Sequence, residues 1–170
     1  MKTLMLLRHG KSDWHHDLSD HDRPLAARGI DAAQRVGRFL ASLDQVPQQV
    51  ISSSATRAKE TIEIAAQSGD WKRTIEFEPR LYDTNAQAVF TWLQERSDEI
   101  QSLLLVGHQP TWGQLTSALI GGGHLRFPTA GLVRIDLQID RWEQIEFGCG
   151  ELVWFELPRT LKGIGWPVDS

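Results

Sequence analysis

Long apolar runs, cysteine pairs and an excess of basic residues are all missing from this 170-residue chain. A single cysteine, Cys149, excludes an internal disulfide, so nothing requires an oxidising compartment. The apolar run at residues 4–7 is too short for a signal-peptide core or a membrane span. With 18 Lys and Arg against 22 Asp and Glu, the net charge is −4, which argues against a general nucleic-acid binder. We therefore expect a cytoplasmic protein without membrane or nucleic-acid partners.

The composition is that of an ordinary globular protein. Hydrophobic residues make up 41% of the chain and charged residues 24%, which is enough apolar material for a core. No repeat, low-complexity tract or Ser/Gly-rich linker divides the sequence, so we expect a single domain over residues 1–170. The composition does not indicate an oligomeric state.

Along most of the chain, short apolar segments alternate with longer segments whose apolar residues recur at helical spacing. Strands are predicted at residues 3–7, 50–52, 74–78 and 102–106. Helices are predicted at residues 26–43, after 53–54, at 86–96 and at 110–120. Two segments of period-two alternation, 132–139 and 144–157, then predict a hairpin. This order predicts a three-layer α/β/α fold, with a mostly parallel sheet and an antiparallel edge hairpin.

Two local details of the helices follow from the same patterns. In the helix at 26–43, apolar residues recur at helical spacing and predict one apolar face: Ile30, Ala33, Val36, Leu40 and Leu43. In the next helix, Ser53 or Ser54 is expected to be the N-cap, because a serine hydroxyl accepts hydrogen bonds from the first free amides.

Arg8-His9-Gly10 follows the first predicted strand and combines three properties that suit phosphate chemistry. Arginine stays charged and matches two phosphate oxygens. An imidazole that is largely neutral at pH 7 can attack as a nucleophile, and glycine lets backbone amides approach an anion closely. Taken alone, the tripeptide also fits a strand end whose side chains are satisfied locally.

Two further predicted strand ends carry complementary residues. Arg57 lies in the first turn of a helix that opens with small hydroxyl residues, where free amides favour an anion. His108 lies between the strand at 102–106 and a helix that starts near Pro110. Each motif alone also fits a structural role. Because ligands collect at the carboxyl ends of parallel strands, the three together predict a cationic phosphate pocket with an attacking imidazole.

These motifs resemble the histidine phosphatase superfamily, the phosphoglycerate-mutase-like clan. The likeness runs over about residues 3–157. The short chain resembles most the SixA-type phosphohistidine phosphatases, on the motifs Arg8-His9-Gly10-Lys11-Ser12, Asp22-Arg23-Pro24-Leu25 with Arg28-Gly29, and Pro128-Thr129-Ala130-Gly131.

The resemblance implies a metal-independent phosphatase with no cofactor. His9 would be the nucleophile that forms a phosphohistidine intermediate, and Arg8, Arg57 and His108 would bind the phosphoryl oxygens. His108 is then expected to be protonated and His9 neutral, so the pocket would have to separate their pKa values, with the bound anion beside His108 as the agent. His9 is expected to donate its other ring proton to a backbone carbonyl.

The general acid for the leaving group is the least defined part of the site. Asp83 lies near the position where many clan members carry an acid, but it could equally cap the following helix; Glu78 is a weaker candidate. The SixA-type enzymes resemble one another in having no well-placed acid. A missing acid favours phosphoramidate or aryl phosphate substrates, whose leaving groups need less proton donation.

Other polar residues could line the cleft. Ser12 and Gln109 are further substrate-binding candidates, and Trp14 and Trp112 could wall the cleft or pack in the core. Arg23 and Arg28 could line the entrance to the pocket, but we expect surface ion pairs instead, with Asp20, Asp22 or Asp31. The remaining candidates are the loop histidines, which match no common metal-ligand spacing: His15, His16 and His21.

The substrate would be a phosphohistidine-bearing protein or a small phosphomonoester. A mutase is less favoured because the chain has little length for a capping segment over the cleft. Short loops favour an open cleft that suits a protein surface, although a small-molecule phosphatase stays open. A non-catalytic phosphohistidine-binding module is the alternative of a different class, and it would not need a nucleophile.

Overall fold

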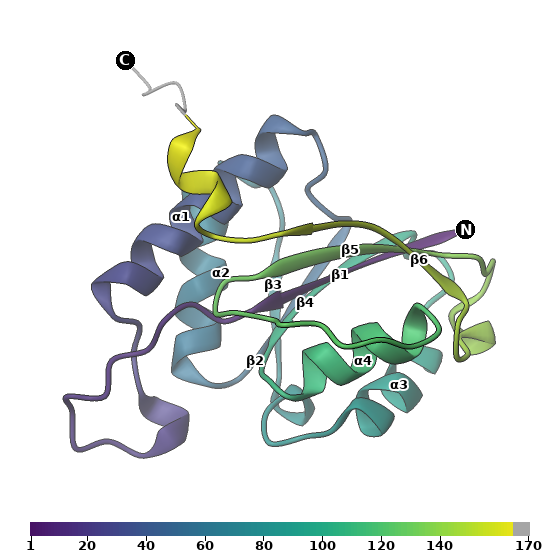
Figure 1. Ribbon diagram of the computed structural model, residues 1–170, viewed down its shortest axis with the longest axis horizontal. Coiled ribbons are helices and arrows are strands. Elements are labelled where there is room, and N and C mark those ends of the chain that lie inside the picture. Colours follow the sequence, from purple (N-terminus) through teal and green to yellow (C-terminus); the bar gives the residue numbers. More distant parts are fainter. Residues whose placement is uncertain (165–170) are drawn as a thin grey trace.

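A computed structural model of the chain describes residues 1–164. Its centre is a six-stranded sheet with the strand order β3-β2-β4-β1-β5-β6 (Figure 1). The first four strands in this order are parallel to one another, and β5 and β6 run antiparallel at one edge. The strands are β1 Lys2–Arg8, β2 Gln49–Ser53, β3 Ile75–Glu78, β4 Ser102–Gly107, β5 Leu132–Leu137 and β6 Gly150–Glu156.

Helices cover both faces of the sheet and form the outer layers. The pair α1 Ala27–Ser42 and α2 Thr56–Ser68 lies on one face, and the pair α3 Ala86–Gln94 and α4 Thr111–Leu119 on the other (Figure 1). Alternate residues of the central strands enter the two cores, as period two requires: Leu104 packs with α1 and α2, whereas Leu103 and Leu105 pack with α3 and α4. The predicted three-layer fold with an antiparallel edge is confirmed.

Three local predictions were wrong in detail. The apolar face of α1 is buried at Ala33, Val36 and Leu40 as predicted, but Ile30 and Leu43 are exposed. Part of the contact with α2 is made instead by Gly37, whose missing side chain lets the helices approach closely. Neither Ser53 nor Ser54 is the N-cap of α2; that position is Ala55, which has no side-chain cap.

The hairpin is also shorter than its sequence pattern indicates. Residues 144–149 lie outside β6, because the connection forms a 3-10 turn at Trp142–Gln144. The indole of Trp142 is fully buried, and its Nε1 donates to the carbonyl of Ile100 at 2.9 Å. Because this buried side chain holds the chain in a turn, the strand predicted from residue 144 onward begins only at β6.

The carboxyl ends of the parallel strands lie together at one end of the sheet. The parallel strands β1, β2 and β4 all end there, while β5 begins there and β6 ends there. His9, Arg57 and His108 follow these strand ends directly or within one turn of helix. No helix among residues 1–164 is both long and apolar enough to cross a membrane.

Candidate active site

His9 follows β1 and is held in one tautomer. Its side chain is buried, and Nδ1 lies 2.7 Å from the carbonyl oxygen of Gly10. A carbonyl can only accept, so Nδ1 carries the proton and the lone pair is on Nε2. Nε2 in turn accepts from Nε of Arg57 at 3.3 Å. The expected donation from His9 to a backbone carbonyl is therefore present, and its nucleophilic lone pair points to the arginine.

Hydrogen bonds tie the loop after β1 to the first turns of α2. The amide of Gly10 donates to the Thr61 hydroxyl at 2.9 Å, and that hydroxyl donates to the carbonyl of Arg57 at 2.6 Å. A Cβ on Gly10 would lie 2.9 Å from the carbonyl oxygen of Gly29, closer than side chains tolerate, so glycine is required at this position. Thr61 thus fixes the distance between the histidine loop and the arginine helix.

His108 completes a compact group with His9 and Arg57. The two imidazole centroids are 5.1 Å apart. Nε2 of His108 lies 2.8 Å from the hydroxyl of Ser53, and Nδ1 lies 3.4 Å from Nη2 of Arg57. Because the guanidinium can only donate, Nδ1 accepts and Nε2 carries the proton. Ser53 therefore holds His108 in a neutral tautomer.

Arg8 adds a second guanidinium at the same strand end. Its Nη1 donates to the carbonyl of Phe127 at 2.9 Å, while its buried Nε has no hydrogen-bond partner among residues 1–164. Burial, and then the charge of Arg57, lower the pKa of Arg8. A buried cationic donor without a partner is costly, and an anion is the ligand that would satisfy it.

The pKa values of the two histidines are both low. Burial lowers the pKa of His9 to about 3, with further lowering by the charges of His108, Arg57 and Arg8. Burial and then the charge of Arg57 lower the pKa of His108 to about 4. Burial and the same arginines act on both rings and favour their neutral forms. The separation of the two pKa values stays a prediction, because it depends on a phosphate beside His108.

Asp20 is a site residue that the sequence analysis assigned only to a surface ion pair. Its backbone carbonyl accepts from Nη1 of Arg57 at 2.6 Å and its carboxylate accepts from Nη2 at 3.2 Å. The same carboxylate accepts from Arg23 at 2.8 Å and from the Tyr82 hydroxyl at 2.8 Å. Hydrogen bonding to Arg23 and Tyr82 and the charge of Arg57 hold the pKa of Asp20 well below its usual range.

Neither proposed general acid makes a hydrogen bond to this group in the described part of the chain. The carboxylate of Asp83 is exposed and makes no hydrogen bond within residues 1–164 to His9, Arg57 or His108. Asp83 does not cap α3 either, since Asn85 does. Glu78 accepts from Arg80, which lowers the pKa of Glu78 and keeps it ionised.

The other predicted site residues lie at the margin of the group. Ser12 is buried and accepts from Arg23, which itself stacks on the exposed ring of Trp14 at 3.5 Å. The Gln109 side chain accepts from the amide of Gly113 at 2.6 Å and so belongs to the start of α4.

The side chains of the remaining aromatic and charged candidates contact other parts of the protein rather than the side chains of His9, Arg57 and His108. Trp112 is fully buried, and its Nε1 donates to the carbonyl of Leu7 at 2.8 Å. Asp31 pairs with Arg35 and leaves Arg28 without the expected ion pair in the described chain. His21 stacks edge-on against Tyr82 at 4.7 Å. Residues 1–164 contain no cluster of three His, Cys, Asp or Glu side chains that could hold a metal ion.

With this geometry in place, comparison with known proteins identifies the family. Residues 4–89 match the family model of the histidine phosphatase superfamily, branch 1, and the chain belongs to this superfamily. It is 34% identical over 163 residues to an uncharacterized protein of Mycobacterium tuberculosis, a match that covers 90% of this chain and 100% of that one.

Solved structures place the chain in the SixA-type branch. The structure of the protein histidine phosphatase SixA complexed with tungstate aligns with a TM-score of 0.81 and 26% identity, over 94% of this chain and 99% of that one. In sequence, phosphohistidine phosphatase SixA of Escherichia coli is 26% identical over 162 residues, 94% of this chain and 96% of its own. The phosphoglycerate-mutase-like fold and the family that the motifs indicated are thereby confirmed.

Proposed function

We propose that the protein is a phosphohistidine phosphatase that acts through a covalent intermediate on His9, without a metal ion. Nε2 of His9 attacks phosphorus, the P–N bond to the substrate imidazole breaks, and a phosphorus–Nε2 bond forms. Water then attacks phosphorus, which releases inorganic phosphate and restores neutral His9. Each step is easier than a direct displacement.

The phosphoryl oxygens would be held by the two arginines and His108. Nε of Arg57 lies 3.3 Å from Nε2 of His9, so the donor and the attacking atom reach the same phosphoryl group. Arg8 contributes the buried Nε that lacks a partner in the described chain. A phosphate dianion between the two rings would raise the pKa of both and favour protonation of His108, whereas in the transition state the arginines offset the charge.

The observation that carries the choice of substrate is that, among residues 1–164, no carboxyl group makes a hydrogen bond to His9 or His108 and so stands ready to donate a proton. Asp20 is the carboxyl nearest to this group by hydrogen bonding, but Arg23, Tyr82 and Arg57 stabilise its ionised form. An alkoxide leaving group would need a proton donor, whereas an imidazole that is already protonated leaves without one. The site therefore suits phosphohistidine, and an aryl phosphate as a test substrate.

A small organic phosphate is the second candidate substrate. One observation favours it: next to the site lies a pocket of about 420 Å³, and several basic side chains line this pocket. This volume fits a small molecule.

Hydrolysis assays test the proposed function. We expect wild-type protein, with chelator present, to hydrolyse para-nitrophenyl phosphate and to dephosphorylate a phosphohistidine peptide, and His9→Ala to do neither. The preference for phosphohistidine predicts a higher kcat/KM for the peptide than for a phosphoserine peptide of the same sequence. Equal values for the two peptides would contradict the proposed leaving group, and activity in His9→Ala would contradict the nucleophile.

A further inference from the structure

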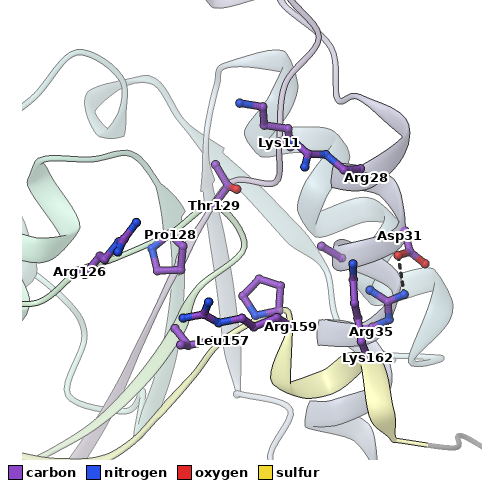
Figure 2. Close-up of a pocket in the computed structure, with 12 residues that line it drawn as sticks. Lys11, Arg28, Asp31, Arg35, Arg126, Pro128, Thr129, Leu157, Arg159 and Lys162 are labelled. Atoms are coloured by element: carbon purple, nitrogen blue, oxygen red, sulfur yellow. Dashed lines mark ion pairs between the residues drawn. The ribbon is translucent and has the colours of Figure 1, made fainter.

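The pocket beside the site collects positive charge from four separate segments of the chain. It lies between α1, the loop before β5 and the segment after β6 (Figure 2). We call it the basic pocket, and its cationic lining residues are Lys11, Arg28, Arg35, Arg126, Arg159 and Lys162. Figure 2 shows these side chains arranged around one opening rather than along a single helix face.

The charge of the basic pocket is unbalanced. Six basic residues and one acidic residue line it, so it holds a third of the 18 Lys and Arg of a chain whose net charge is −4. The acidic residue, Asp31, pairs with Arg35 at 2.5 Å. The other five cations make no ion pair within residues 1–164. Like charges gathered in one concave surface repel one another and attract anions.

The walls of the basic pocket are direct chain neighbours of the catalytic group. Lys11 follows His9 by two residues, a separation of at most about 7 Å along an extended chain. Thr129 precedes Ala130, whose amide donates to the carbonyl of His9 at 3.0 Å. On the other wall, a Cβ on Gly29 would lie 2.3 Å from the carbonyl oxygen of Lys11, so this glycine lets the start of α1 approach the histidine loop and brings Arg28 beside Lys11.

The remaining lining restricts what the anion can be. A volume of about 420 Å³ lies within the usual range for small-molecule sites. Between the cations lie apolar surfaces of Pro128, Leu157 and Pro158, which fit a compact organic body. The buried side chain of Leu161 packs the C-terminal turn Thr160–Gly163 near α1 and so holds Arg159 and Lys162 at the opening.

We propose that the basic pocket binds a second phosphate of the substrate while the first lies against His9. The small organic phosphate that is the second candidate substrate would then carry two or more phosphates. This inference rests on the proposed function for catalysis and extends its second candidate substrate. The attraction is electrostatic and shared among several guanidinium and ammonium groups, so it grows with the number of phosphates on the ligand.

The test compares two probes that share one ring, inositol monophosphate and inositol hexakisphosphate. Both are measured by calorimetry and as inhibitors of para-nitrophenyl phosphate hydrolysis. We expect the hexakisphosphate to bind at least tenfold more tightly and to inhibit competitively. In the double variant Arg126→Gln/Arg159→Gln, its affinity falls about tenfold or more. The control double variant Lys72→Gln/Arg141→Gln removes the same charge from exposed sites outside the pocket and keeps the affinity within twofold.

Three results would overturn the proposal. Equal weakening in both double variants means that the effect is general charge. Noncompetitive inhibition means that the polyphosphate is a separate effector rather than part of the substrate. Binding of an octaglutamate peptide as tightly as the hexakisphosphate, lost in the pocket variant, assigns the pocket to an acidic protein segment. If wild type hydrolyses no aryl phosphate, the proposed function fails, but calorimetry still decides whether the pocket binds polyphosphate.

Discussion

Folding stability should fall steeply between pH 8 and pH 5 because of the two active-site histidines. In the unfolded chain each imidazole has a pKa near 6.5, whereas in the folded protein the pKa is about 3 for His9 and about 4 for His108. Between these pKa values the two histidines are protonated in the unfolded chain but stay neutral in the folded protein. The stabilisation is fully present above pH 6.5 and is lost as the pH falls below that value toward the folded pKa values.

The size of the effect follows from proton uptake by the unfolded chain. At pH 5 an unfolded histidine binds almost one proton and the folded one almost none, which costs about 2 kcal/mol for His9. His108 is less buried than His9, so its share is somewhat smaller. The free energy of unfolding should thus decrease by about 3–4 kcal/mol from pH 8 to pH 5. Ordinary carboxylates titrate below this window and contribute little to the change.

Urea unfolding at four pH values between 8 and 5 measures this dependence. Wild type and His124→Asn, a substitution at an exposed histidine, should show the full decrease. His9→Asn and His108→Asn should each lose about half of it, because one of the two depressed sites is gone. A pH-independent free energy of unfolding, or the same slope in all four proteins, would refute the assignment of neutral buried imidazoles.

Other predictions concern activity on para-nitrophenyl phosphate. Asp20→Asn should lower kcat/KM by about 10- to 100-fold, since Arg57 loses a charged hydrogen-bond partner; an unchanged value would remove Asp20 from the site. Ser53→Ala should lower kcat more than it raises KM, because the His108 tautomer is no longer fixed; Ser53→Thr should restore it. Between pH 7 and 5, kcat/KM should show no loss from His9 protonation, whereas a pKa of 6.5 would give a drop of about 25-fold. Asp83→Asn should change kcat less than threefold, in contrast to a general acid.

Much of the fold was predictable because local patterns and global topology agree. The apolar segment predicted as a strand at 102–106 forms β4, and the helix predicted at 86–96 forms α3. The apolar face of α1 was right at its centre but wrong at Ile30 and Leu43, since Gly37, which carries no hydrophobic signal, makes part of the contact with α2. The start of the second hairpin strand was wrong, since the chain makes a 3-10 turn around the buried Trp142 and β6 begins only at Gly150.

The site was predictable only where residues follow a strand end. His9, Arg57 and His108 meet for that reason. Asp20 reaches Arg57 from a polar loop without periodicity, so no sequence pattern indicates where its carboxylate lies. The basic pocket is formed by residues from both ends of the chain, and only tertiary structure brings Lys11 and Arg159 together.

The central claim is that phosphate is transferred to His9 itself. Rapid quenching of para-nitrophenyl phosphate turnover under alkaline conditions, followed by peptide mass spectrometry, tests it most directly. We predict an acid-labile phosphate on the peptide that contains His9, attached at Nε2 because Nδ1 donates to Gly10, and no labelled peptide from His9→Ala. Phosphate on any other residue, or turnover at full rate in His9→Ala, would contradict the account.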